Sequence, residues 1–275
     1  MLRITETVKH LIIINVLFWI ATLTIGANGE VFNNLFALHF PKNDSFGIWQ
    51  FFSHMFMHAS YGITPTGGYG IATQHILYNM FALWMFGSAV EGAFGKSKFI
   101  FFYISAGLGG ALLTLGIDYA NFLTTMSDLS VGIDPNAMEE ILAINSGNGE
   151  GYFTGENFFK YLRPIAETYN LALTPADIGT LFELNVINHK RMLGASGAIS
   201  GIMAAFAFMF PNTRLFPIPL KAKHFIPLMF VGDLYFGFSG SGSGVAYFAH
   251  IGGALFGLFM VWYWKKNQFN NNRWN

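Results

Sequence analysis

The sequence contains no cysteine at any of its 275 positions. Disulfide bonds, thiolate metal sites and a cysteine nucleophile are therefore all excluded. Charged side chains are also scarce: they make up 11% of the residues, against roughly a quarter in an ordinary soluble domain. Because hydrophobic residues account for 53% of the chain, this composition predicts a membrane protein.

The chain also lacks net charge, since 15 Lys and Arg residues balance 15 Asp and Glu residues. No basic stripe alternates with aromatic residues along the sequence. We therefore expect no nucleic-acid partner.

What the sequence does contain is a series of long hydrophobic stretches. A helix needs about 20 mostly apolar residues to cross the hydrocarbon core, and somewhat fewer when it is tilted or buried by protein. The first stretch is not followed by a small-residue cleavage site, so we interpret it as a retained helix and not as a signal peptide. The predicted fold is an all-α membrane protein with a bundle of six transmembrane helices. The six stretches are Leu11–Gly26, His75–Val90, Phe99–Ile117, Gly194–Phe210, Phe225–Phe238 and Val245–Trp264.

Lys and Arg residues gather on one side of this predicted bundle. Short cytoplasmic connections carry an excess of these residues, and here they flank the inner ends of the stretches. We expect both termini to lie in the cytoplasm. The short N-terminus, without an Arg- and Ser-rich leader, favours an integral multi-pass protein of the bacterial cytoplasmic (inner) membrane. The residues concerned are Arg3, Lys9, Lys96, Lys98, Arg214, Lys221, Lys223, Lys265, Lys266 and Arg273.

Residues 118–191 interrupt the hydrophobic pattern with many acidic side chains. We interpret residues 1–275 as a single membrane domain, and residues 118–191 as a polar insertion on the outer side between the third and fourth helices. Asp134-Pro135 and Thr174-Pro175 each place a capping residue before a proline at the first helical position. The insertion is therefore predicted to contain short helices after both sites.

Polar side chains inside membrane helices are costly, so each is a candidate for function. The second stretch begins with His75, and Asn79 follows one turn later on the same face. The fourth stretch begins with a Gly-Ala-Ser-Gly sequence that contains Ser196, and the sixth carries His250 near its start. Since these three helices all run inward from the outer side, we expect the four side chains to share one level near the outer surface.

These four groups suit nucleophilic catalysis. A serine hydroxyl is a weak nucleophile until an adjacent base accepts its proton, and His250 is the natural base for Ser196. The resulting oxyanion needs hydrogen-bond donors, which the Ser196 N–H, Asn79 and His75 could supply. We expect Asp233 and Glu91 to lie deeper or on the wrong side, so the sequence predicts no third carboxylate at this site.

Pairs of glycines follow both reacting residues. Gly197 and Gly201 come directly after Ser196, and Gly253 and Gly257 come after His250. Small residues four apart allow two membrane helices to approach closely. We therefore expect backbone contact between the fourth and sixth helices.

These segments resemble the rhomboid family. Residues 194–197 (Gly-Ala-Ser-Gly) are similar to its GxSG nucleophile motif, and residues 249–253 (Ala-His-Ile-Gly-Gly) to its catalytic histidine segment. Residues 54–58 and 75–79 resemble its first loop and second helix, and residues 87–91 the inner end of that helix. The resemblance covers all six predicted helices in order.

The resemblance implies a six-helix rhomboid core and an intramembrane serine endopeptidase. Such an enzyme hydrolyses peptide bonds in or near the transmembrane segments of membrane-protein substrates within the lipid bilayer. Ser196 and His250 would form its catalytic dyad, while His75 and Asn79 would stabilise the oxyanion. No metal and no cofactor are implied.

Two positions differ from the family pattern. Trp49 is followed by Gln50 where the family often has arginine, which removes a charge that helps to hold the first loop. Ser200 stands where an aromatic residue often stacks beneath the catalytic histidine. These differences leave open the alternative of a catalytically inactive rhomboid-like protein that binds membrane clients.

Two further alternatives concern other kinds of site. A small transporter would distribute polar residues through the membrane depth, whereas here they gather near one face. His54 and His58 have the spacing of two metal ligands on a helix. Because no glutamate lies between them and no third ligand is evident, we favour hydrogen bonding that orders the first loop.

Overall fold

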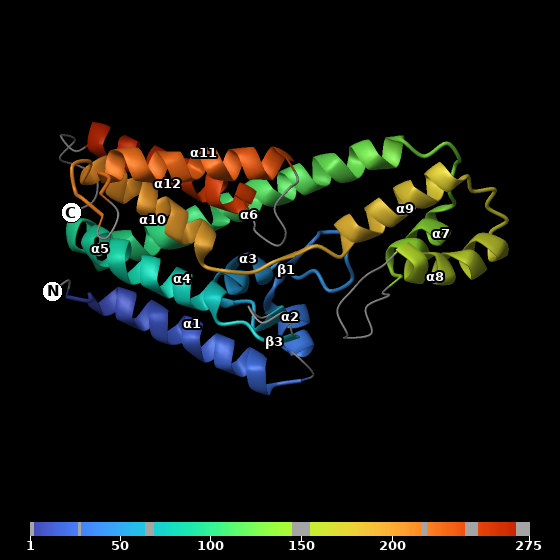
Figure 1. Ribbon diagram of the computed structural model, residues 1–275, viewed down its shortest axis with the longest axis horizontal. Helices are drawn as coiled ribbons and strands as arrows, with labels where there is room; N and C mark the ends of the chain where they lie inside the picture. The colour runs from blue at the N-terminus through green and yellow to red at the C-terminus, as the bar shows by residue number, and fades with distance from the viewer. Residues whose placement is uncertain are drawn as a thin grey trace.

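The computed structural model describes residues 3–26, 29–63, 69–144, 155–215, 219–239 and 247–267. Figure 1 shows an elongated helical bundle with a smaller group of helices, α7 to α9, at one end. The helices are α1 (Glu6–Thr24), α2 (Glu30–Phe36), α3 (Gln50–Ser53), α4 (Gln74–Ala82), α5 (Ser88–Phe94), α6 (Lys96–Ser127), α7 (Pro135–Leu142), α8 (Gly155–Thr168), α9 (Pro175–Asn188), α10 (Ser196–Met209), α11 (Ala222–Ser239) and α12 (Tyr247–Lys266), with helical turns η2 (His54–Phe56) and η3 (Leu83–Gly87).

Short strands form two antiparallel pairs within the loops. Strand β1 (Leu38–His39) pairs with β4 (Arg191–Met192), and β2 (Tyr61–Ile63) pairs with β3 (Tyr69–Ile71). The first pair joins the loop after α2 to the segment that leads into α10. It therefore fixes the approach of the chain to Ser196.

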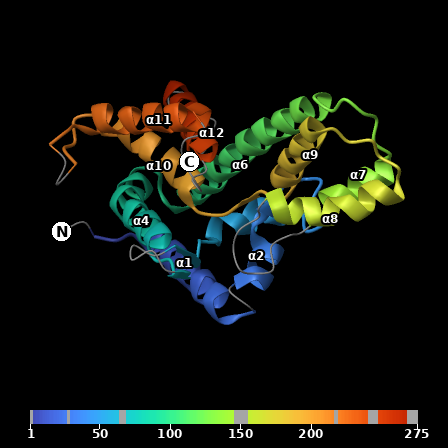
Figure 2. The ribbon, with the colours of Figure 1, turned by 45° about the vertical axis from the view of Figure 1, so that its right-hand side comes forward.

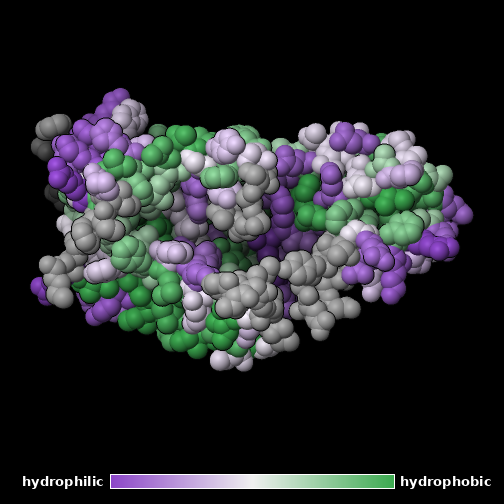
Figure 3. All heavy atoms as spheres, viewed as in Figure 1, coloured by the Kyte–Doolittle hydropathy of each residue, from purple (hydrophilic) through white to green (hydrophobic). Residues whose placement is uncertain are grey.

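The six predicted hydrophobic stretches all fall on helices, namely α1, the continuous α4–η3–α5, α6, α10, α11 and α12. Residues 245–246 of the sixth stretch lie outside the described residues. Among the described helices, α1 and α6 are long and apolar enough to cross a membrane, and α10 is a shorter apolar helix. Large apolar side chains are exposed on α1, α11 and α12, and Figure 3 shows a hydrophobic surface over α1 and α11. Such a surface suits lipid better than water.

The helix that contains the third hydrophobic stretch extends beyond Ile117, where that stretch ends. Helix α6 continues to Ser127 and leaves the bundle, and α9 runs back alongside it (Figure 2). Phe122, near the end of this extension, is buried among side chains of α7, α8 and α9. The hydrophobic run ends where α6 leaves the bundle, but the helix itself continues because its far end packs against other helices.

Helix α10 lies at the centre of the bundle, packed against α6 and α12. A Cβ on Gly253 would overlap the carbonyl of Gly197, and a Cβ on Gly257 would lie 2.7 Å from the Cα of Gly201. Only glycine allows the two backbones to come this close. The predicted glycine-mediated contact between these helices is confirmed.

Helices α7 to α9, here called the α7–α9 unit (residues 135–188), are held by a core of their own. Phe158, Leu162, Leu181 and Leu184 are buried in it together with Phe122 of α6. The predicted helix starts after Asp134 and after Thr174 are confirmed, since α7 begins at Pro135 and α9 at Pro175.

Both caps use a side-chain oxygen. Asp134 accepts a hydrogen bond from the N–H of Asn136 at the start of α7, at 2.8 Å. Thr174 and Asp177 form a reciprocal capping box at the start of α9, and Asp177 also accepts from the N–H and hydroxyl of Ser130. The capping box thereby ties α9 to the segment between α6 and α7.

Glu91, in α5, contacts the start of α1. Its carboxylate accepts hydrogen bonds from the N–H groups of Thr7 and Val8 and from the Thr5 hydroxyl. Helix α1 has no side-chain cap from its own N-cap residue. Glu91 therefore supplies from another helix the acceptor that α1 lacks.

Candidate active site

Ser196 is the first residue of α10, and Gly194 sets its surroundings. The φ of Gly194 is +127°, a conformation that favours glycine. A Cβ at this position would lie 3.0 Å from Cε1 and 3.1 Å from Nε2 of His75, and 3.7 Å from Oγ of Ser196. The absence of a side chain on Gly194 therefore lets the His75 ring and the Ser196 hydroxyl lie on the same side of the backbone.

The hydrogen bonding of His75 identifies its protonated nitrogen. The backbone N–H of Ala59 donates to Nδ1 of His75 at 3.1 Å. Because an imidazole nitrogen that accepts a hydrogen bond carries no proton, the proton of the neutral ring lies on Nε2. This is the nitrogen near Gly194 and Ser196, so His75 presents a donor to that region.

A chain of polar contacts behind His75 reaches α1. Nε2 of His58 lies 2.8 Å from Oδ1 of Asn15, and the rings of His58 and His75 are 5.1 Å apart. Asn15 and His58 are both fully buried. These contacts limit the positions that the His75 ring can adopt.

Asn79 is buried one turn below His75 on α4. Its Nδ2 donates to the backbone oxygen of His75 at 2.8 Å, and its Oδ1 has no hydrogen-bond partner among the described residues. One N–H of the amide is thus used within the helix. The other N–H makes no hydrogen bond to the described residues.

His250 lies in the first turn of α12, beside the first turn of α10. The carbonyl of Ala249 packs against Gly197 and Gly110, and His250 is close enough to interact electrostatically with His75. The structure thus brings three sequence-predicted residues, Ser196, His250 and His75, to the same end of three helices. Between the described residues Ser196 and His250 themselves, no hydrogen bond is formed.

Asp233 was wrongly predicted to lie away from this site. Its Oδ2 is 3.2 Å from Nδ1 of His250, and the two side chains are 17% and 21% exposed. Helices α11 and α12 follow one another in the chain and pack together. Asp233 and His250 each lie within about two turns of the outer end of their helix, so a helical hairpin places them at a similar level. The shared level of the two residues follows from their positions in the sequence.

The first loop is held by hydrogen bonds in place of an ion pair. The buried side chain of Gln50 donates to Ser45 O at 2.7 Å and Asn34 O at 3.3 Å, and accepts from the N–H of His39 at 3.2 Å. Gln50 therefore orders the loop without the charge that we expected such a role to need.

His54 connects this loop to the site. Its Nδ1 is 2.7 Å from Gln50 O, and its own carbonyl accepts from the N–H of Gly194 at 2.9 Å. The hydrogen-bonding role favoured for His54 and His58 is confirmed. The described residues contain no group of three or more potential metal ligands.

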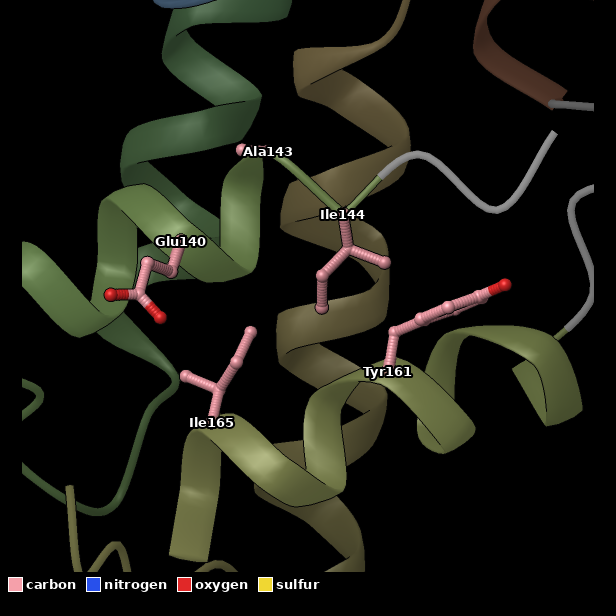
Figure 4. Close-up of a pocket in the computed structure, with 5 residues that line it drawn as sticks. All are labelled: Glu140, Ala143, Ile144, Tyr161 and Ile165. Carbon is pink, nitrogen blue, oxygen red and sulfur yellow. The ribbon is translucent and has the colours of Figure 1, made fainter. Parts of the chain in front are cut away.

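A hollow between α7 and α8 is a different kind of feature. It has a volume of about 330 Å³ and is lined by Glu140, Ala143, Ile144, Tyr161 and Ile165 (Figure 4). Its two polar side chains, Glu140 and Tyr161, point away from each other (Figure 4). We therefore do not regard it as the candidate active site.

Comparison with known proteins identifies the family. A family model described as the Rhomboid domain matches residues 45–133 and 166–267, which together make up more than half of the chain. The chain belongs to the rhomboid family. Rhomboid family membership makes it an integral membrane protein. The family match omits residues 134–165, which include α7 and most of α8.

Two relatives show how far the similarity extends. The chain is 26% identical over 167 residues to "Rhomboid protease GluP" of Bacillus subtilis, covering 61% of this chain and 30% of the relative. It is 29% identical over 111 residues to "Rhomboid protein 1, mitochondrial" of Saccharomyces cerevisiae, covering 36% of this chain and 31% of the relative. The aligned segments thus span less than a third of either relative.

Proposed function

We propose that this rhomboid protein is an intramembrane serine endopeptidase that cleaves membrane proteins in or near their transmembrane segments. Ser196 is the nucleophile, His250 is its base, and His75 and Asn79 stabilise the oxyanion. The observation that carries the proposal is the contact of Gly197 with Ala249. It supports the two reacting residues lying side by side at the start of neighbouring helices.

The proposed reaction begins when Oγ of Ser196 attacks the scissile carbonyl carbon and its proton passes to Nε2 of His250. The oxyanion receives a hydrogen bond from Nε2–H of His75, from the free N–H of Asn79 and from the backbone N–H at the start of α10. His250 then protonates the leaving amine. Water hydrolyses the acyl-enzyme by the same steps in reverse, releasing the new carboxylate and restoring Ser196.

The proposed membrane topology has six spanning helices, both termini in the cytoplasm of a bacterium and the α7–α9 unit on the outer side. In Figure 1 the start of α1 and the end of α12 lie at the same end of the bundle, opposite the α7–α9 unit. Lys265 and Lys266 lie in the last turn of α12, and Lys96 begins α6 at this end. This distribution supports the proposed orientation.

Cleavage of a reporter membrane protein in liposomes tests the mechanism. We expect Ser196→Ala and His250→Ala each to lower kcat by at least about 1,000-fold. Ser200→Ala, a buried serine one turn later on α10, and His224→Ala, an exposed histidine on α11, are matched controls and should retain activity. Wild-type cleavage by either Ser196→Ala or His250→Ala would contradict the dyad.

The alternative of an inactive client-binding protein is favoured by one observation, the missing hydrogen bond between Ser196 and His250. A fluorophosphonate probe separates the two functions because it reacts only with an activated serine. Labelling of the wild type that Ser196→Ala abolishes would support the protease. A wild type that binds membrane clients but stays unlabelled would support the alternative.

A further inference from the structure

Asp233 is an acidic residue in the apolar part of α11, far from Lys223 and His224 in the first turn of that helix. Leu228, Val231 and Leu234, its neighbours on α11, are exposed apolar side chains that suit lipid. An ionisable group on such a helix is costly unless it has a partner. Among the described residues, the partner of Asp233 is His250, whose Nδ1 lies 3.2 Å from Oδ2.

From this contact, and on the basis of the function proposed above, we infer that Asp233 is a positioning residue that orients His250 for catalysis. A carboxylate can only accept a hydrogen bond, so the proton on His250 must lie on Nδ1. Nε2 then carries a free lone pair. It is the nitrogen that must accept the proton of Ser196.

The charge of Asp233 has a second effect during the reaction. When His250 takes the proton of Ser196, the ring becomes a cation with protons on both nitrogens. A carboxylate held against Nδ1 stabilises this cation, and it does so more strongly in a partly buried site than in water. Asp233 keeps its charge throughout, because the proton moves only between Ser196, His250 and the leaving amine.

The surroundings of His250 offer no equivalent support. No aromatic ring stacks on its imidazole within the described part of the chain, and Ser200, one turn after Ser196, is too small to hold a ring by stacking. Among the described residues, His75 on α4 also interacts electrostatically with His250. That ring already uses Nδ1 to accept from Ala59, so it presents no acceptor to Nδ1–H of His250.

Helix α11 thereby takes part in the proposed chemistry. Helix α11 carries none of the four residues assigned above to the dyad and the oxyanion site, yet it supplies the carboxylate that orders the base. The serine, the base and the positioning acid thus come from three different helices: α10, α12 and α11.

The test compares variants at position 233 in the full chain, assayed with the reporter substrate in liposomes. Asp233→Asn keeps the size of the side chain but removes its charge. Its amide can also donate, which permits the wrong tautomer of His250. We expect kcat to fall by about 10- to 1,000-fold with KM changed less than about twofold. Asp233→Glu should recover part of kcat, and Tyr235→Phe, which removes a polar atom from the exposed face of the same helix, should match the wild type.

A nitrogen-15 NMR measurement of the histidine side chains tests the inference without any variant at position 233. His250 is assigned by the signal that His250→Ala removes. In the wild type we expect the proton of the neutral ring on Nδ1. Observation of the proton on Nε2 would overturn the inference, even if Asp233→Asn failed to fold.

The outcomes separate this inference from the proposed function. Wild-type kcat in Asp233→Asn, combined with inactivity of Ser196→Ala, would overturn the role of Asp233 and leave the protease intact. Equal loss of kcat in Asp233→Asn and Asp233→Glu, with Nε2 protonated in the wild type, would reduce Asp233 to a packing residue. Cleavage by Ser196→Ala would instead remove the proposed function itself.

Discussion

The interface between α10 and α12 is packed in the opposite way to the core of the α7–α9 unit. In the first, glycines bring two backbones together, and a Cβ at Gly253 or Gly257 would collide with the facing helix. In the second, large side chains such as Phe158, Leu181 and Leu184 fill the space between amphipathic helices. Water drives apolar side chains together, whereas lipid does not, so helices in lipid rely on close backbone contact. The difference in packing therefore supports two different solvents for the two regions.

The substitution Phe158→Ala tests this comparison with the largest expected effect. Phe158 is 0% exposed and its ring lies 5.4 Å from that of Phe182. Removing it should destabilise the α7–α9 unit by about 3–5 kcal/mol. Hydrogen–deuterium exchange on the full protein should show faster exchange in α7 to α9, with protection of α10 and α12 unchanged.

The neighbouring residue provides the control for this experiment. Phe159 is 47% exposed, so Phe159→Ala should change stability by less than about 0.5 kcal/mol. If Phe158→Ala accelerated exchange equally in α10 and α12, the two regions would form one cooperative unit, and the comparison would fail.

A smaller effect is expected from Gly253→Ala in the other region. The added methyl group meets the carbonyl of Gly197, which is backbone and cannot rotate away. Overpacking of this kind costs about 1–3 kcal/mol, and it should also lower fluorophosphonate labelling because it separates α10 from α12. Thermal unfolding in detergent measures the first effect.

Gly116→Ala is the matched control on α6, since a Cβ at Gly116 has no other atom within 4 Å. Alanine favours a helix by about 0.5–1 kcal/mol over glycine, so this variant should be as stable as the wild type or more so. Equal destabilisation by both substitutions would show that close backbone contact is not what holds α10 to α12.

The smallest expected effect concerns the capping box of α9. Thr174→Ala removes the acceptor for the N–H of Asp177 and should cost the α7–α9 unit about 1 kcal/mol at neutral pH. Exchange of the first amides of α9 measures it. Asn170→Ala, in the preceding turn, is a control that leaves the capping box intact. Because Asn170 has a positive φ of 51°, this variant tests backbone strain and not capping.

Acid provides a second measurement of the same box. Hydrogen bonds from the Thr174 side chain, and then from Ser130, lower the pKa of Asp177 below its usual value. The stability that this carboxylate contributes is present above its unfolded pKa of about 4 and is lost as the pH falls through the lower folded value. The wild-type unit should therefore lose stability on acidification below about pH 4. Thr174→Ala should show a weaker dependence on pH, and an unchanged dependence would contradict the assignment.

Much of the fold was accessible from the sequence because the hydrophobic stretches and capping residues carry strong local signals. The starts of α7 and α9 were predicted from Asp134-Pro135 and Thr174-Pro175, where a capping oxygen precedes a fixed φ. The end of α6 at Ser127 was not predicted, because hydropathy indicates whether a helix lies in an apolar environment and not where the helix ends. The burial of Phe122 depends on helices that come later in the chain.

The candidate site was predicted in part for a similar reason. Ser196, His250 and His75 were recognised because each is a polar residue near the start of a hydrophobic stretch. The contact of Asp233 with His250 depends on the rotation of α11 about its axis, which an evenly apolar helix does not reveal. The tautomer of His75 depends on Ala59, a loop residue whose sequence carries no signal.

The carboxylate of Glu91 has a consequence for the assembly of the bundle. Helix α1 is synthesised before α5, but two of its leading amide groups find their acceptor only on a residue more than 80 positions later in the chain. Until α5 arrives, these amides must rely on water or lipid headgroups. The start of α1 therefore gains its side-chain acceptor only when α5 packs against it. This couples the docking of the N-terminal segment to the placement of the continuous helix α4–η3–α5.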